Sequence, residues 1–239
     1  MKTLVTQIKM QKDLYLSNML AMMLMFLFGV IIEAVVLHVD GDTGMICMGS
    51  LLAVIGLIMV MFFFGGFHMT STCNYALMMG QTRKSFVWSY MLSTLLTYVV
   101  SAVTWEILHQ LEMLGIRIMN PNVQIDDAFG AFITWKMWLA VILLATSVGS
   151  LVGATIVKFG KAAFWVWWAL MMLTFIGGPR LLVMISVMPR ENAMVRMMMY
   201  LIGFIVEHVM LTVSIAVTVV TLVSVVATWL LLRKQQVNV

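Results

Sequence analysis

Histidine, cysteine and carboxylate side chains carry most metal and proton chemistry, and in this chain they are few and widely separated. The histidines are His38, His68, His109 and His208. None of them has a spacing typical of metal ligands. Cys47 and Cys73 lie 26 positions apart, about 39 Å along a helix, so we expect no disulfide between them. The patterns GxxxxGK(S/T), GxGxxG, HExxH and GxSxG are absent. We therefore expect no enzyme activity, metal site or nucleotide site in this chain, and any transport must draw its energy from a partner or an ion gradient.

A few ionisable residues could still line a path or move protons. Glu33 is the one acid well inside an apolar run, and because intramembrane carboxylates usually face a partner or a cavity, it could contact a substrate or a gate. The alternatives are a structural hydrogen bond or a position near the outer interface. Glu106 and His109 lie one helical turn apart, and Glu207 directly precedes His208. Both pairs mark predicted span ends, so we interpret them as boundary residues rather than proton relays.

Large apolar side chains suggest either a substrate path or a lipid-facing surface. The chain has 26 methionines, and Trp165, Trp167 and Trp168 form a cluster. Flexible thioethers and tryptophans could line a path for amphipathic peptides. Lipid-facing bulk and an interfacial aromatic belt explain most of them better. Gly149 and Gly153 have GxxxG spacing, which favours close helix packing over a transport role.

The segment 70–85 interrupts two long apolar runs with polar and basic residues, and it has helix signals of its own. The hydroxyl residues 70–72 are suitable N-caps, and Cys73–Met79 could make about two helical turns. Gly80 suits the position just after a helix, and Thr82 could cap the next span. The pattern predicts a short helix between two spans.

One face of that predicted helix could bind a partner. Tyr75, Met78 and Met79 share it by i, i+3, i+4 spacing, as apolar anchors in a groove would. Arg83 and Lys84 follow at a helix N-terminus, where the helix dipole disfavours cations, so the positive-inside bias explains them better than helix stability does. The alternative is an ordinary cytoplasmic loop whose charges only set topology.

Composition places the chain among proteins with several membrane spans, since 63% of its 239 residues are hydrophobic and 10% are charged. A span needs about 20 mostly apolar residues, and a backbone in lipid must satisfy its own hydrogen bonds, which favours helices. We expect one all-α transmembrane domain over residues 1–239. Six runs are predicted to span the membrane: 16–39, 46–68, 86–108, 133–157, 162–180 and 209–232.

Basic residues gather on one side of these predicted spans, with Asp13 as the one acid among them. They are Lys2, Lys9, Lys12, Arg83, Lys84, Lys158, Lys161, Arg233 and Lys234. Because basic residues near span ends favour the cytoplasm, both termini and the 70–85 segment are predicted to be cytoplasmic. The net charge of +4 then follows from topology, and we expect no nucleic-acid partner.

Three further segments complete the predicted architecture. Residues 1–15 are expected to form an amphipathic interfacial helix, with a simple charged anchor as the alternative. The loop 109–132 is interpreted as an irregular outer cap. Gly177, Gly178 and Pro179 break the apolar pattern, and because the pieces within 181–207 are too short to span, we expect a re-entrant outer helical hairpin there.

The string CNYALMMGQTRKSFVWSYML resembles the cytoplasmic loop of ABC-2-type transporter permeases, where an F/N-x-A-L-x-x-G-x-(S/T)-R-K pattern recurs between the second and third spans. The matching positions are Asn74, Ala76, Leu77, Gly80, Thr82, Arg83 and Lys84. The layout of an amphipathic start, six spans, a coupling helix and a broken outer hairpin is also similar. The importer signature EAA-x3-G is absent from the predicted cytoplasmic loops, which argues for export.

The resemblance implies a permease subunit in a bacterial plasma membrane, acting as a homodimer or heterodimer with separate ATP-binding subunits. ATP and Mg would bind those subunits, and no cofactor would bind this chain. Residues 73–80, Thr82, Arg83 and Lys84 would contact the ATPase. A further set could line the substrate path or gate: Glu33, Trp165, Trp168, Pro179 and Glu207. Peptide exporters, including those for phenol-soluble modulins, look most similar, so the cargo would be an amphipathic or hydrophobic peptide. The competing class is an ATPase-independent membrane protein, such as a gradient-driven carrier or an immunity or sensor protein.

Overall fold

The computed structural model describes residues 2–40, 47–119, 133–178, 180 and 209–233, and these contain helices and no strand. The helices are α1 (Lys2–Met10), α2 (Lys12–Asp40), α3 (Met48–Met78), α4 (Arg83–Met119), α6 (Trp135–Phe159), α7 (Lys161–Met172), the π-helix η1 (Leu173–Gly177) and α10 (Val209–Arg233). Five of them, α2, α3, α4, α6 and α10, are long and apolar enough to cross a membrane. The predicted all-α class is confirmed for the described residues.

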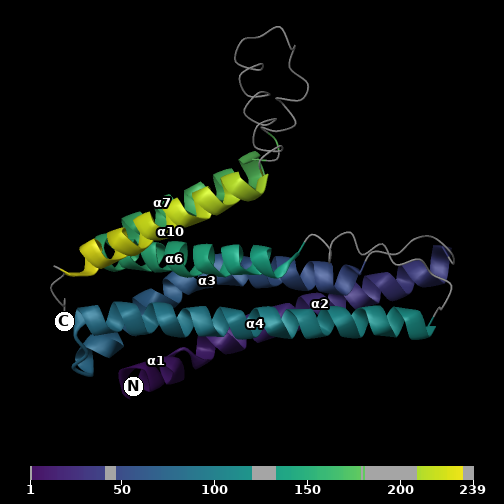
Figure 1. Ribbon diagram of the computed structural model, residues 1–239, viewed down its shortest axis with the longest axis horizontal. Coiled ribbons are helices and arrows are strands. Elements are labelled where there is room, and N and C mark those ends of the chain that lie inside the picture. The colour runs from purple at the N-terminus through teal and green to yellow at the C-terminus, as the bar shows by residue number, and fades with distance from the viewer. Residues whose placement is uncertain (1, 41–46, 120–132, 179, 181–208, 234–239) are drawn as a thin grey trace, which may run out of the picture.

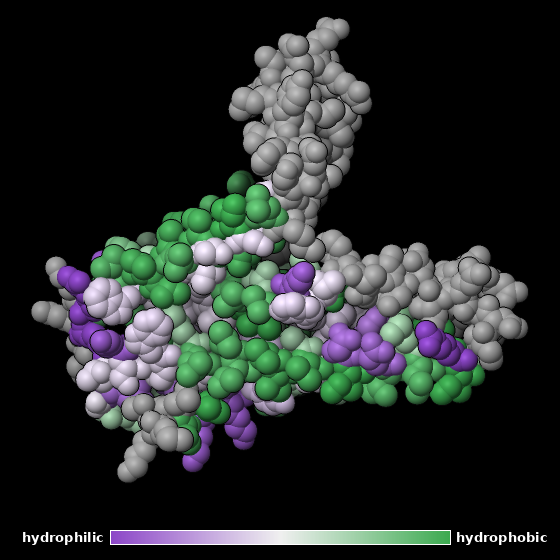
Figure 2. Space-filling view, viewed as in Figure 1, coloured by the Kyte–Doolittle hydropathy of each residue, from purple (hydrophilic) through white to green (hydrophobic). Residues whose placement is uncertain are grey.

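Along α1 and α2 polar side chains are buried and apolar side chains are exposed. Gln7, Gln11, Asn18 and Glu33 are buried. The exposed side chains include Val5, Ile8, Leu16, Leu20, Leu24 and Ile31. A water-soluble protein buries apolar side chains and exposes polar ones, whereas in lipid the apolar side chains face outward and polar groups find partners inside the bundle. This pattern fits a multi-pass membrane protein, and Figure 2 shows apolar residues over much of the visible flank.

The long helices α2, α3 and α4 extend side by side, α6 packs on α3, and α10 packs on α6 (Figure 1). A cluster of buried side chains joins one end of several helices. Its packed members include Met10 of α1, Leu77 of α3, Val157 of α6 and Leu231 of α10. The helix ends that carry the predicted cytoplasmic lysines and arginines therefore do share one end of the bundle.

Glycines bring α3 and α6 into close contact, as the GxxxG spacing predicted. A Cβ on Gly153 would lie 2.8 Å from the Gly66 carbonyl oxygen, and a Cβ on Gly66 would lie 2.7 Å from the Val152 side chain. Gly149 lies nearby, 3.8 Å from Gly65 by the same measure. Small residues let helix backbones approach closely, which is a main source of packing energy between helices in lipid.

The helices do not end where the predicted spans end. α3 continues to Met78, past residue 68, and α4 continues to Met119, past residue 108. In both helices the apolar run ends first, and backbone hydrogen bonds carry the helix further. The predicted interfacial helix over 1–15 is divided, because α1 ends at Met10 and α2 begins at Lys12.

The predicted fifth span, 162–180, corresponds to α7 with 12 residues and η1 with five, and neither has spanning length alone. The predicted break at Gly177 is the last residue of a π-helix. Pro179, the hairpin 181–207 with Glu207, and most of the predicted outer cap, 120–132, lie outside the described residues.

Candidate functional site

The turn between α3 and α4 has the cap geometry that its sequence predicts. Gly80 has a φ of +78°, its N–H donates to the Leu77 carbonyl at 3.0 Å, and the Gln81 N–H donates to the Ala76 carbonyl at 3.1 Å. These two bonds make a Schellman motif. Thr82 caps α4, because its Oγ1 accepts from the Ser85 N–H at 3.3 Å. The turn is therefore well defined by local hydrogen bonds.

The predicted separate coupling helix is wrong, since the predicted helix 73–79 forms the last turns of α3. The hydroxyls of Thr70, Ser71 and Thr72 are not N-caps: they donate back to the carbonyls of Gly66 and His68, at 2.8 to 3.1 Å. Such hydrogen bonds satisfy the hydroxyl groups of Ser and Thr inside a helix. These residue types can therefore lie within a helix and do not have to mark its N-terminus.

The exposed part of this turn is smaller than the predicted docking set. Tyr75, Met78 and Met79 are 62%, 68% and 57% exposed. Asn74, Gly80, Thr82 and Lys84 are exposed as well. We call these seven residues the hairpin end. The remaining predicted residues face inward: Cys73 and Ala76 are buried, Leu77 packs against the same core, and Arg83 Nη1 lies 3.5 Å from the Leu232 carbonyl.

The contact of Arg83 accounts for a cation at the first position of a helix. Its guanidinium reaches the carbonyl end of α10, where the helix dipole favours positive charge. The contact also ties the start of α4 to the end of the last helix.

Replacing Gly80 with alanine should lower the unfolding free energy by about 1–2 kcal/mol, because an L-residue with this positive φ is strained. The matched control is Gly115, a helical glycine of α4 at which an added Cβ would meet nothing within 4 Å. Gly115→Ala should raise stability by about 0.5–1 kcal/mol. Thermal unfolding in detergent measures both, and shifts of the same sign would contradict this account of the turn.

At the opposite end of α3, a carboxylate from another helix caps the first turn. Cys47 is the N-cap residue and its side chain makes no capping bond. Glu112 of α4 supplies the acceptor instead: Oε1 accepts from the Gly49 N–H at 2.6 Å, and Oε2 accepts from the Ser50 N–H at 2.7 Å. A charged acceptor at a helix N-terminus is favoured by the unpaired N–H groups and by the dipole.

Ser50 and His109 extend this site. The His109 Nδ1 lies 2.9 Å from the Ser50 Oγ, and the Ser50 carbonyl accepts from the Trp105 Nε1–H at 2.8 Å. The Trp105 and His109 rings stack with centroids 5.3 Å apart and an interplanar angle of 3°. Four of these side chains, His109, Glu112, Trp105 and Ser50, are buried. The ring of His109 is thus held in a fixed orientation.

Glu33 of α2 joins the same site. Its side chain is 4% exposed, and its carboxyl lies beside the Glu112 carboxyl. Two ionised carboxylates in contact repel each other, so the pair must hold a proton or a cation between them. We call Glu33, Cys47, Ser50, His109 and Glu112 the buried polar cluster.

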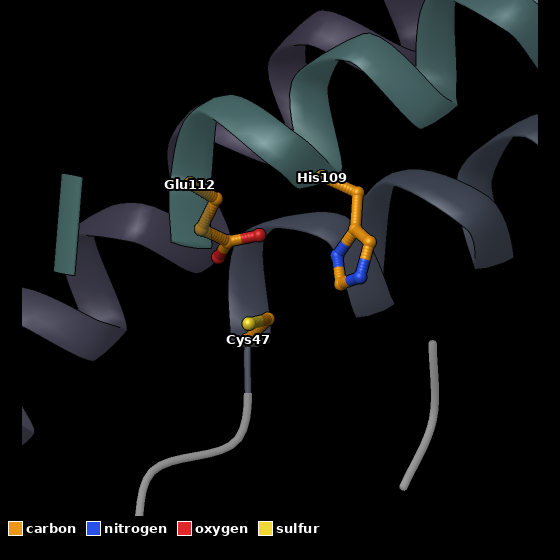
Figure 3. A group of neighbouring side chains, drawn as sticks. All are labelled: Cys47, His109 and Glu112. Carbon is orange, nitrogen blue, oxygen red and sulfur yellow. The ribbon is translucent and has the colours of Figure 1, made fainter. Parts of the chain in front are cut away.

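Figure 3 shows Cys47, His109 and Glu112 converging at the start of α3, the last two from successive turns of α4. One ligand atom from each of the three lies within 4.8 Å of the other two. The sequence prediction missed this cluster, placing Glu112 in a loop and pairing His109 with Glu106. In the structure Glu106 is exposed and accepts from Gln110 at 3.1 Å, whereas His109 is buried beside Ser50. One feature of the sequence could have indicated the cluster: Trp105, His109 and Glu112 recur on one face of a helix.

Two of the remaining predicted path residues, Trp165 and Trp168, lie in the part of the chain that the structure describes. Trp165 and Trp168 are 60% and 43% exposed on α7, in edge contact with each other at 5.8 Å, and no α7 side chain is buried. Trp167 instead donates its Nε1–H to the Thr155 hydroxyl at 2.8 Å. A separate apolar groove of about 640 Å³ lies between α4 and α6, with Glu106 as its one acid.

No protein-family model matches this chain, and comparisons with curated proteins and with solved structures give no significant match. Its function must be argued from its own residues.

Proposed function

We propose that this chain is the membrane subunit of an ATP-driven exporter, with the hairpin end as the docking site for a separate ATP-binding subunit. The observation that carries the proposal is the exposure of Tyr75, Met78 and Met79 beside Lys84 at the end of the bundle shared by α1 and α10. Aromatic and methionine side chains are common anchors at protein interfaces. The motif resemblance supports the same assignment.

The continuity of α3 supports a mechanism for coupling. Its 31 residues extend about 46 Å, from the hairpin end to the buried polar cluster. A force applied by the ATPase at Tyr75 would move α3 as a rod, and its close contact with α6 at Gly66 and Gly153 would pass that motion on. No separate joint divides the docking residues from the span.

The proposal also includes the membrane architecture that the resemblance to ABC-2-type permeases implies. The chain would cross a bacterial plasma membrane six times, α7 with η1 being part of the fifth crossing, and both termini would be cytoplasmic. A second protomer would cover part of the exposed apolar surface of α7 and α10, including Trp165 and Trp168. The cargo would be an amphipathic or hydrophobic peptide.

The docking residues can be tested by co-purification in detergent with a co-expressed ABC ATP-binding subunit. Tyr75→Ala combined with Met78→Ala removes two exposed anchors without touching the core. The control, Ile118→Ala with Met119→Ala, removes two side chains that are 73% and 76% exposed at the far end of α4. We expect the first pair to reduce recovered complex at least about tenfold, equivalent to about 1.4 kcal/mol, and the control to leave it unchanged.

Equal recovery of the complex with both double variants would rule out docking at the hairpin end. Leu77 and Arg83 are poor choices for this experiment, because Leu77 packs in the core and Arg83 contacts α10.

A second function has one observation in its favour. A gradient-driven carrier usually has several buried ionisable residues, and no such group is evident from the sequence, but in the structure Glu33, His109 and Glu112 lie together in the bundle. In that case reconstituted vesicles would transport substrate with an ion gradient and no ATPase. Transport that requires the ATPase and ATP would favour the exporter.

A further inference from the structure

We propose that the buried polar cluster binds a divalent transition metal ion of the zinc class, with Cys47, His109 and Glu112 as its protein ligands. The first three offer ligand atoms within 4.8 Å of one another, and all three are buried (Figure 3). Glu33 is almost fully buried, its carboxyl contacts that of Glu112, and its Oε1 has no hydrogen-bond partner in the structure. The cluster thus supplies three protein ligands, from α4 and the start of α3, and Glu33 of α2 lies beside them.

The ligand types select the metal. A thiolate, an imidazole and carboxylates suit zinc and its close relatives, whereas calcium and magnesium prefer oxygen ligands alone. Zinc is held by four protein ligands in structural sites and by three plus a water in catalytic sites, and this cluster offers three.

Hydrogen bonds around His109 orient it as a ligand. The Ser50 hydroxyl donates to the Cys47 carbonyl at 3.2 Å, so it accepts from the His109 Nδ1–H at 2.9 Å. This tautomer puts the lone pair on Nε2. Metal-bound histidines commonly donate their other ring N–H to an oxygen in this way, and the stacked Trp105 ring holds the plane of the imidazole.

Charge balance also favours a cation. Glu33 and Glu112 bring two carboxyl groups into contact, and the thiolate form of Cys47 adds a third negative charge beside them. A divalent ion removes the repulsion that would otherwise accompany ionisation of the pair. The bound ion would join the start of α3 to α4, beside Glu33 of α2, at the end of the bundle opposite the hairpin end. This inference does not depend on ATPase docking.

Cobalt(II) binding to the purified full chain in detergent tests the site, because thiolate coordination to cobalt gives a characteristic charge-transfer absorption. The protein is first stripped with a chelator and then titrated with Co²⁺, followed by Zn²⁺ as competitor. Cys47→Ser removes the thiolate ligand. Cys73→Ser is the matched control, since Cys73 is likewise a buried cysteine and lies near the other end of α3.

We expect the wild type and Cys73→Ser to bind one Co²⁺ per chain with the thiolate absorption and to release it to Zn²⁺. Cys47→Ser should lose that absorption and bind about 10- to 100-fold more weakly. Zn²⁺ should raise the unfolding temperature of the wild type and Cys73→Ser, and raise that of Cys47→Ser much less. Absence of Co²⁺ binding by the wild type would overturn the proposal. Equal binding by the two cysteine variants would overturn it as well.

Discussion

Replacing Glu112 with alanine is expected to destabilise the purified protein strongly. The substitution leaves the Gly49 N–H and Ser50 N–H without their acceptor at the start of α3. A buried donor that loses its partner costs about 1–3 kcal/mol, so the two together should cost about 2–6 kcal/mol. The loss of the carboxylate also removes a favourable charge at the helix N-terminus. Thermal unfolding in detergent, with a chelator present so that no metal contributes, measures the effect.

Glu106 provides the matched control on the same helix. Its carboxylate is exposed and accepts one hydrogen bond from exposed Gln110, so Glu106→Ala should change stability by less than about 0.5 kcal/mol. Glu112→Gln should fall between the two, because its amide oxygen can accept from one N–H while its NH₂ group faces the other. If Glu112→Ala and Glu106→Ala shift the unfolding temperature equally, Glu112 does not cap α3.

The sequence predicted the helical class, the long apolar runs of the five spanning helices and the cap residues Gly80 and Thr82. These features depend on local chemistry: apolar length, a glycine with positive φ and a hydroxyl acceptor. The helix ends near the interfaces were less predictable. At Thr70–Thr72 the fall in hydropathy marks a change of surroundings, but the hydroxyls bond back to α3 and the helix continues.

The buried polar cluster was beyond sequence reasoning because its members are far apart in the chain. Glu112 caps a helix that begins more than 60 residues earlier, and no spacing rule links those positions. The boundary assumed at residue 108 also hid the shared face of His109 and Glu112. Gln7 and Gln11 were missed for a related reason: the expected amphipathic face was apolar, whereas in the bundle these amides point inward and Gln11 donates to Thr94 at 2.8 Å.

The two glycines of the GxxxG pair should respond very differently to substitution. A Cβ on Gly153 would lie 2.6 Å from the Met69 Cβ and 2.8 Å from the Gly66 carbonyl oxygen, so α3 and α6 must separate to accept it. A Cβ on Gly149 would meet nothing closer than 3.8 Å. Overpacking a tight contact costs about 1–3 kcal/mol, whereas alanine at a roomy helical position gains about 0.5–1 kcal/mol over glycine.

We therefore expect Gly153→Ala to lower the unfolding temperature in detergent and Gly149→Ala to leave it unchanged or raise it. The paired substitution Met69→Gly with Gly153→Ala removes the Met69 Cβ, which Met69→Ala would keep. Relative to Met69→Gly alone, Gly153→Ala should then cost less if the clash is with the Met69 side chain, and about the same if the Gly66 backbone sets the limit. Because the Gly66 oxygen cannot move without shifting α3, we expect about the same cost. Equal destabilisation by both glycine variants would mean that the two helices approach along the whole motif rather than at Gly153. In that case α3 would pass motion to α6 over a longer contact than the one at Gly66.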